Sequence, residues 1–193
     1  MKKLALSILI ALFAVTSFQA QASNEVLNKI MLTSLKLSIA NEMHINNLVN
    51  WKIGENQEYD MSAVFGNIGK MVKIVDREQG NAIWVKTDIT GMMSQNAEAL
   101  IDRATGKILE YRQNGQKQEL PDDKLEIISQ DATSITVPAG TFEVIHIVAK
   151  SEKVKKLEVW ANPRDIVMDG AAQMVIDAGM ITVTMKLVKF GGR

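Results

Sequence analysis

The two histidines, His44 and His146, are the residues with which this sequence could most readily build acid–base or metal chemistry. Both lie in stretches with the alternating pattern of a β-strand, far apart along the chain. The absence of cysteine excludes thiol catalysis and cysteine-ligated metal sites. The sequence contains no G-x-S-x-G elbow, H-E-x-x-H motif, P-loop or G-x-G-x-x-G motif. We therefore interpret His44 as a polar-face residue and His146 as a hydrogen-bonded, partly buried one, and expect neither an enzyme nor a cofactor.

The carboxylates form no recognisable metal or catalytic motif. Asp122-Asp123 follows Pro121, and after a proline such a pair is typical of a turn that caps its own backbone. Asp165 and Asp169-Gly170 resemble part of a calcium loop, but apolar residues occupy the intervening positions where D-x-[DN]-x-[DN]-G needs oxygen ligands. We expect no metal site. The lysine-rich run 150–156 is interpreted as a solvated turn, with a contact to membrane phosphates as the alternative.

Methionine is unusually frequent, with eleven in the chain. Its flexible, polarisable side chain fills irregular cores and also lines adaptable apolar binding surfaces. Filling the core is the competing interpretation for each of these residues. Met92-Met93, directly after Gly91, falls in a predicted loop and is the least core-like. The candidate ligand-binding methionines are Met92, Met93, Met168 and Met174.

Trp160 is the fifth candidate ligand-binding residue. It shares the even-numbered face of a predicted strand with Glu158, opposite Leu157 and Val159. An indole on an otherwise polar face often marks a groove or a second layer of structure. Three tryptophans are too few for the aromatic platform of a nucleic-acid-binding protein.

The N-terminus has the pattern of a cleavable secretory signal. Lys2 and Lys3 precede an apolar run from Leu4 to Val15, and Ala20-Gln21-Ala22 places small residues at the cleavage position. The run is shorter than the ~20 residues that span a bilayer. We predict a signal peptide over 1–22 and one domain over 23–193 that has no transmembrane segment and is periplasmic or secreted.

The charge of the exported chain is close to balanced. Removing Lys2 and Lys3 leaves 20 basic residues against 22 acidic ones, a net charge of −2. Such a balance gives no field that would attract nucleic acid. Without disulfides, stability must come from packing.

Turn signals recur throughout the chain between alternating apolar stretches, a spacing typical of antiparallel β-proteins. Asn114-Gly115 is the strongest hairpin signal, since both positions of a type I′ turn need positive φ. Pro138-Ala139-Gly140 marks a second hairpin, and Gly66-Asn67 is a predicted turn. We predict a mainly β domain of about nine antiparallel strands, forming a strongly curved sheet or half-barrel with one or two short helices.

Two segments are ambiguous. A short helix over 24–32 leading into a strand over 34–45 fits the pattern near the N-terminus, while a helix over 25–40 is the competing interpretation. The segment 165–178 is predicted to be a loop or a short helix.

Several motifs resemble those of exported bacterial domains of unknown function. These are V-P-A-G-T-F-E at 137–143 and E-V-W-A-N-P-R-D-I-V-M-D-G-A-A-Q-M-V at 158–175, with W-K-I-G-E at 51–55 and I-D-R-A-T-G-K-I at 101–108. Groups of this kind are similar to the lipoprotein-carrier superfamily, in which a curved antiparallel sheet wraps a helical lid around an apolar cavity. The resemblance implies non-catalytic binding of acyl chains or other apolar ligands in the envelope.

Two functions follow as hypotheses. The first is a non-enzymatic envelope protein that binds a lipid-like or other apolar ligand, or assists envelope assembly. The second is a structural module that binds another envelope protein through a sheet edge or the face carrying Trp160.

Overall fold

The computed structural model describes residues 49–92, 94–120, 125–151, 154–179 and 181–192, together with Leu32 and Lys36. The predicted signal peptide, His44, Met93 and Asp122-Asp123 lie outside the described residues.

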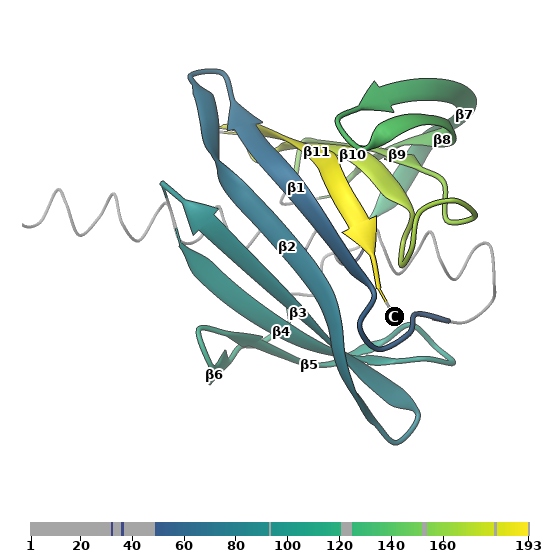
Figure 1. Cartoon of the computed structure of the whole chain (residues 1–193). Coiled ribbons are helices and arrows are strands. Elements are labelled where there is room, and N and C mark those ends of the chain that lie inside the picture. The colour runs from purple at the N-terminus through teal and green to yellow at the C-terminus, as the bar shows by residue number, and fades with distance from the viewer. Residues whose placement is uncertain are drawn as a thin grey trace, which may run out of the picture.

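The described part of the chain forms a single antiparallel sheet of eleven strands (Figure 1). Its order is β6-β5-β4-β3-β2-β1-β11-β10-β9-β8-β7. The strands are β1 (Asn56–Ala63), β2 (Gly66–Gln79), β3 (Ala82–Gly91), β4 (Gln95–Asp102), β5 (Ile108–Gln113), β6 (Gln116–Lys117), β7 (Glu126–Val137), β8 (Gly140–Lys150), β9 (Lys156–Ala161), β10 (Ala171–Asp177) and β11 (Thr182–Gly191). The mainly β, antiparallel prediction is confirmed, with eleven strands in place of about nine.

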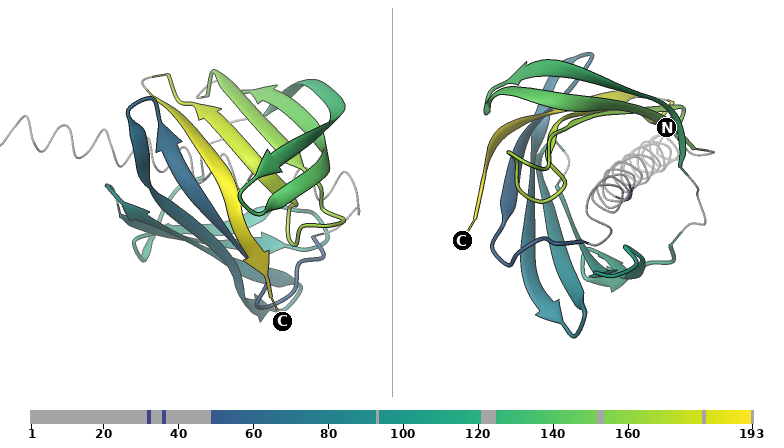
Figure 2. Two further views of the ribbon diagram at one scale, coloured as in Figure 1. Left: turned by 45° about the horizontal axis from the view of Figure 1, so that its top comes forward. Right: turned by 90° about the vertical axis from the view of Figure 1, so that its right-hand side faces the viewer.

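The connectivity forces the sheet to curve. β1 and β11 pair at its centre, whereas its two edges, β6 and β7, follow one another in the sequence. The connection 118–125 can span at most about 30 Å, whereas a flat sheet of this width would measure about 48 Å between its edge strands. The edges must therefore approach each other, and Figure 2 shows the strands arranged around one concave side.

The turns agree with the sequence in two places and differ in one. Asn114 and Gly115 have φ of 50° and 77°, as their turn between β5 and β6 requires, and the 138–140 segment joins β7 to β8. The turn predicted at Gly66-Asn67 lies two residues earlier, at Val64-Phe65. Both residue types favour strands, yet here they form the hairpin tip.

Two element predictions are wrong. Within 165–178, residues 171–177 form β10, which pairs with both β9 and β11. Ala171, Ala172 and Asp177 are of types that are depleted in strands, and the position of the segment between two strands determines its conformation. Near the N-terminus, Leu32 and Lys36 are both helical. The strand predicted over 34–45 is therefore wrong at Lys36, and the alternative helix over 25–40 agrees with both residues.

The core lies along one face of the sheet. Registered neighbours such as Tyr59, Met71 and Ile89 occupy the same buried face on β1, β2 and β3. The same hydrophobic cluster continues through Met185 and Met174 on β11 and β10. Leu32 is buried in this cluster as well, so a helical residue from the N-terminal region packs against the strands.

Candidate functional site

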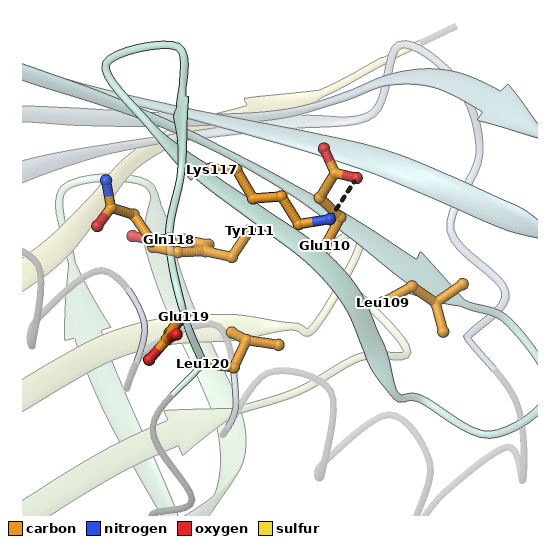
Figure 3. A pocket seen from close by; sticks show the side chains of 7 residues that line it. All are labelled: Leu109, Glu110, Tyr111, Lys117, Gln118, Glu119 and Leu120. Atoms are coloured by element: carbon orange, nitrogen blue, oxygen red, sulfur yellow. Dashed lines mark hydrogen bonds and ion pairs between the residues drawn. The ribbon is translucent and has the colours of Figure 1, made fainter.

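An open cavity of about 520 Å³ lies beside the hairpin that β5 and β6 form at one edge of the sheet. Leu109, Tyr111 and Leu120 supply its apolar wall (Figure 3). Tyr111 belongs to the hydrophobic core, whereas the two leucines are exposed. The apolar wall therefore combines one buried core residue with two exposed leucines.

The polar rim of the cavity consists of Glu110, Lys117, Gln118 and Glu119. Lys117 Nζ lies 3.4 Å from Glu110 Oε2, and the Arg112 guanidinium donates to Glu110 Oε1 at 2.6 Å (Figure 3 shows the first pair). The hydrogen bond from Arg112 lowers the pKa of Glu110 and holds its carboxylate ionised. Burial raises the pKa of Tyr111, which keeps its phenol neutral. An apolar wall with a charged rim suits an amphipathic molecule.

The backbone closes the bottom of this cavity. The Gln118 N–H donates to the Tyr111 carbonyl at 2.9 Å, which extends the ladder one residue beyond β6. This bond holds Gln118 beside β5, and Leu120, two residues further on, lines the cavity together with Leu109.

The methionines proposed as ligand-binding residues are separated in the structure. Met168 and Met174 are buried in the hydrophobic core. Met92 is 71% exposed at the end of β3. None of these three lines the cavity beside β5 and β6.

Met92 belongs to an apolar tip that sequence reasoning did not find. Its N–H donates to the Ile68 carbonyl at 3.0 Å, so the β3–β4 connection lies beside the start of β2. The adjacent β1–β2 turn carries Val64, which is 94% exposed, and Phe65, which is 67% exposed. We call Val64, Phe65 and Met92 the apolar tip. Polar residues normally occupy such turns, so the exposed apolar side chains at these two turns are unusual.

Trp160 lies on the polar face predicted for it. Leu157 and Val159 are buried on the other face of β9. The Trp160 ring stacks on His146, with centroids 4.2 Å apart, and His146 Nε2 lies 3.1 Å from Glu158 Oε2. The interpretation of His146 as hydrogen-bonded and partly buried is confirmed.

A buried polar cluster joins β1 and β2 to the loop before β10, and it was not predicted. Lys73 Nζ lies 2.6 Å from Asp169 Oδ2, and the two side chains are only 2% and 1% exposed. Gln57 donates to Asp169 Oδ1 at 2.7 Å, and the Tyr59 hydroxyl donates to the Ala171 carbonyl at 2.9 Å. Burial, with a smaller contribution from the Asp169 charge, raises the pKa of Tyr59 well above its usual value. The sequence contained one sign of this cluster. Lys73 alternates with Met71 and Val75, so it lies on the same buried face of β2 as these two residues.

The loop 162–170 is constructed around Asn162. Its side-chain amide donates to the Glu143 carbonyl at 2.8 Å, and its Oδ1 accepts from the Arg164 N–H at 3.0 Å. Gly170, with φ of 72°, lies against the backbone of Asn162 and Pro163. Such an approach has no room for a Cβ, and it brings Asp169 to Lys73. This cluster fastens the loop to the sheet and offers no open site.

Within the described residues, no three histidine or acidic side chains gather where they could hold a metal ion. The same part of the chain contains no helix long and apolar enough to cross a bilayer.

Comparison with known proteins adds information on the fold. No family model matches the chain, and no curated protein sequence matches it. The hypothetical protein CT021 from Chlamydia trachomatis has a similar structure, with a TM-score of 0.50 at 12% identity over 75% of this chain and 89% of that one.

Two further solved structures are similar at lower scores. A protein from Bacteroides fragilis with a YmcC-like fold has a TM-score of 0.44 at 11% identity, over 75% of this chain and 98% of that one. MucB has a TM-score of 0.40 at 8% identity, over 82% of this chain and 58% of that one. At such identities, the likeness to CT021 concerns the fold alone.

Proposed function

We propose that this chain is an exported, non-enzymatic protein of the bacterial envelope that binds an apolar or lipid-like ligand. The observation that carries the proposal is the cavity of about 520 Å³ beside β5 and β6. Its volume lies within the ~300–1,000 Å³ typical of small-molecule sites. Its wall of Leu109, Tyr111 and Leu120 is apolar, and its rim is charged. An acyl chain would lie against the wall, with its polar end at the rim.

The curved sheet supports the same function. Its connectivity requires the two edges to approach each other, and the cavity opens at one of these edges. Export rests on the predicted signal peptide over 1–22. The likeness to the lipoprotein-carrier superfamily, stated above from short motifs, implies the same class of ligand.

Uptake of a fluorescent fatty acid by the purified exported protein tests the proposal. Leu109→Glu and Leu120→Glu place a carboxylate in the apolar wall, and because both leucines are exposed, we expect the fold to be retained. Each variant should weaken uptake at least severalfold. Ile53→Glu, at an exposed residue outside the cavity lining, is the matched control and should bind as the original chain does.

Native mass spectrometry gives an independent test without an added ligand. The proposal predicts an extra mass that organic solvent removes and that matches a lipid. Protein that carries no such mass and takes up no fatty acid would contradict ligand binding. The alternative function, binding of another envelope protein, is favoured by a different feature, the edge strand β7.

A further inference from the structure

Among the described residues, none pairs with the outer edge of β7. β7 pairs only with β8, and within the described residues no backbone hydrogen bond reaches its other side. Nearly all residues of Glu126–Val137 are exposed or half-buried. The opposite edge of the sheet differs, because β6 has only two residues and offers almost no free ladder. The long free ladder is therefore a feature of β7 alone among the two edges.

β7 lacks most of the devices that protect an edge strand. Natural edges are blunted by lysine, proline, short length or bulges, since an open ladder pairs with other chains. Glu126–Val137 contains no lysine, arginine, proline or glycine. One register shift occurs between Ile127 and Ser129, near the start of the strand. Ile127 and Ile128, at 51% and 56% exposure, add apolar surface beside the open ladder.

We propose that β7 binds an extended segment of a partner polypeptide, which adds to the sheet as a twelfth strand. In this mode main-chain hydrogen bonds provide affinity, and alternate side chains provide specificity. The inference goes beyond the ligand binding proposed above and does not depend on it.

Charge specifies the kind of segment. The carboxylates of β7 are Glu126, which lies 3.3 Å from Lys150 Nζ, and Asp131. Asp131 is exposed near the middle of the strand and makes no ion pair within the described residues. β7 carries no basic residue that would repel a cation. A segment with a lysine or arginine opposite Asp131 is therefore complementary.

A second copy of the chain fits the edge less well. A dimer held through the twelve residues of β7 alone would bury about 400 Å² per copy, half of what a stable dimer needs, whereas a single peptide strand of this area is a weak ligand held by main-chain hydrogen bonds. β7 also bends strongly with β8, and the hairpin tip reaches β11, where the Ala139 N–H donates to the Leu187 carbonyl (Figure 1). A flexible segment can follow this bend, whereas a rigid copy of β7 would match it over a part only.

The test uses four synthetic peptides and the full exported chain. The first is acetyl-Thr-Val-Thr-Lys-Thr-Val-Thr-amide, and the second has Glu in place of Lys. The third and fourth are the Lys peptide with N-methyl groups on alternate amides, along one edge in the third and along the other edge in the fourth. Affinity is measured by calorimetry, and the site by hydrogen exchange of the β7 amides.

We expect the Lys peptide to slow exchange along β7 and to bind about two- to fivefold more tightly than the Glu peptide, the range for one exposed ion pair. Asp131→Lys should reverse this preference. N-methylation along the bonding edge should abolish binding. Absence of binding, equal binding by all N-methylated forms, or protection located elsewhere would overturn the proposal. A stable dimer with protected β7 amides in the absence of peptide would also overturn it, since a second copy would then occupy the edge.

Discussion

Lys73 on β2 and Asp169 in the loop before β10 form a buried ion pair with 2.6 Å between Nζ and Oδ2. The residues are 96 positions apart. β1 and β11 stand between β2 and β10 in the sheet, so loop 162–170 reaches across these strands and brings Asp169 to Lys73. Gln57 and the Ala171 N–H also donate to Asp169, so its carboxylate holds the loop, β1 and β2 together.

Removing Lys73 should strongly destabilise the domain. Lys73→Met leaves the Asp169 carboxylate buried without its cation, and breaking such a pair costs about 3–5 kcal/mol. Urea unfolding at pH 7 measures this loss. The matched control is Lys70→Met on the same strand, where Lys70 and Glu58 form an exposed pair at 2.9 Å. That change should cost far less than Lys73→Met, because solvent screens the exposed pair. Equal effects of the two variants would contradict the importance of the buried pair.

Gly170 should tolerate no side chain. Its φ of 72° costs an L-residue about 1–2 kcal/mol, and a Cβ would overlap the backbone of Asn162 and Pro163, so Gly170→Ala should cost about 3–5 kcal/mol in total. Gly80→Ala is the control, because Gly80 has φ of 61° and open space around its Cβ position. Only the conformational cost should appear there in urea unfolding. Similar losses in the two variants would show that loop 162–170 can move away.

The local features of this fold were predictable, and the long-range ones were not. Asn114-Gly115 determines its own turn through positive φ at both positions, and alternation placed Trp160 opposite Leu157 and Val159. No local pattern links Lys73 to Asp169, since their contact depends on the order of the central strands. Val64 and Phe65 have the β-propensity of strand residues, whereas here they form a turn. The cavity could not be predicted from the sequence, because Leu109 and Leu120 come to line the same space only when β5 and β6 form their hairpin.

Tyr59 should make the stability of the domain sensitive to alkaline pH. Burial and the Asp169 charge raise its pKa in the folded state, whereas the unfolded chain ionises near pH 10. The stabilisation of the folded state by Tyr59 is therefore fully present below pH 10 and is lost as the pH rises above that value. Tyr59→Phe removes the hydrogen bond to the Ala171 carbonyl and should cost about 1–2 kcal/mol at pH 7.

The difference in free energy of unfolding between the original chain and Tyr59→Phe should then shrink by roughly 1 kcal/mol for each pH unit above 10. Urea unfolding from pH 8 to pH 11 measures it. Tyr111 and the lysines are common to both proteins, so their titration cancels in the difference. Parallel stability curves over this range would show that Tyr59 ionises equally easily in the folded protein.

Met92 and Met168 should respond very differently to the same substitution. Met168 is 5% exposed and lies in the core beside Asp169, so Met168→Glu buries an unpaired carboxylate and should cost more than about 3 kcal/mol. Met92 is exposed at the apolar tip, so Met92→Glu should change the free energy of unfolding by less than about 0.5 kcal/mol. Fatty-acid uptake by Met92→Glu therefore reports on the surface itself. We expect uptake equal to that of the original chain and of Ile53→Glu, because Met92 does not line the cavity beside β5 and β6. A loss of uptake in Met92→Glu would contradict the cavity as the ligand site and would direct attention to the apolar tip.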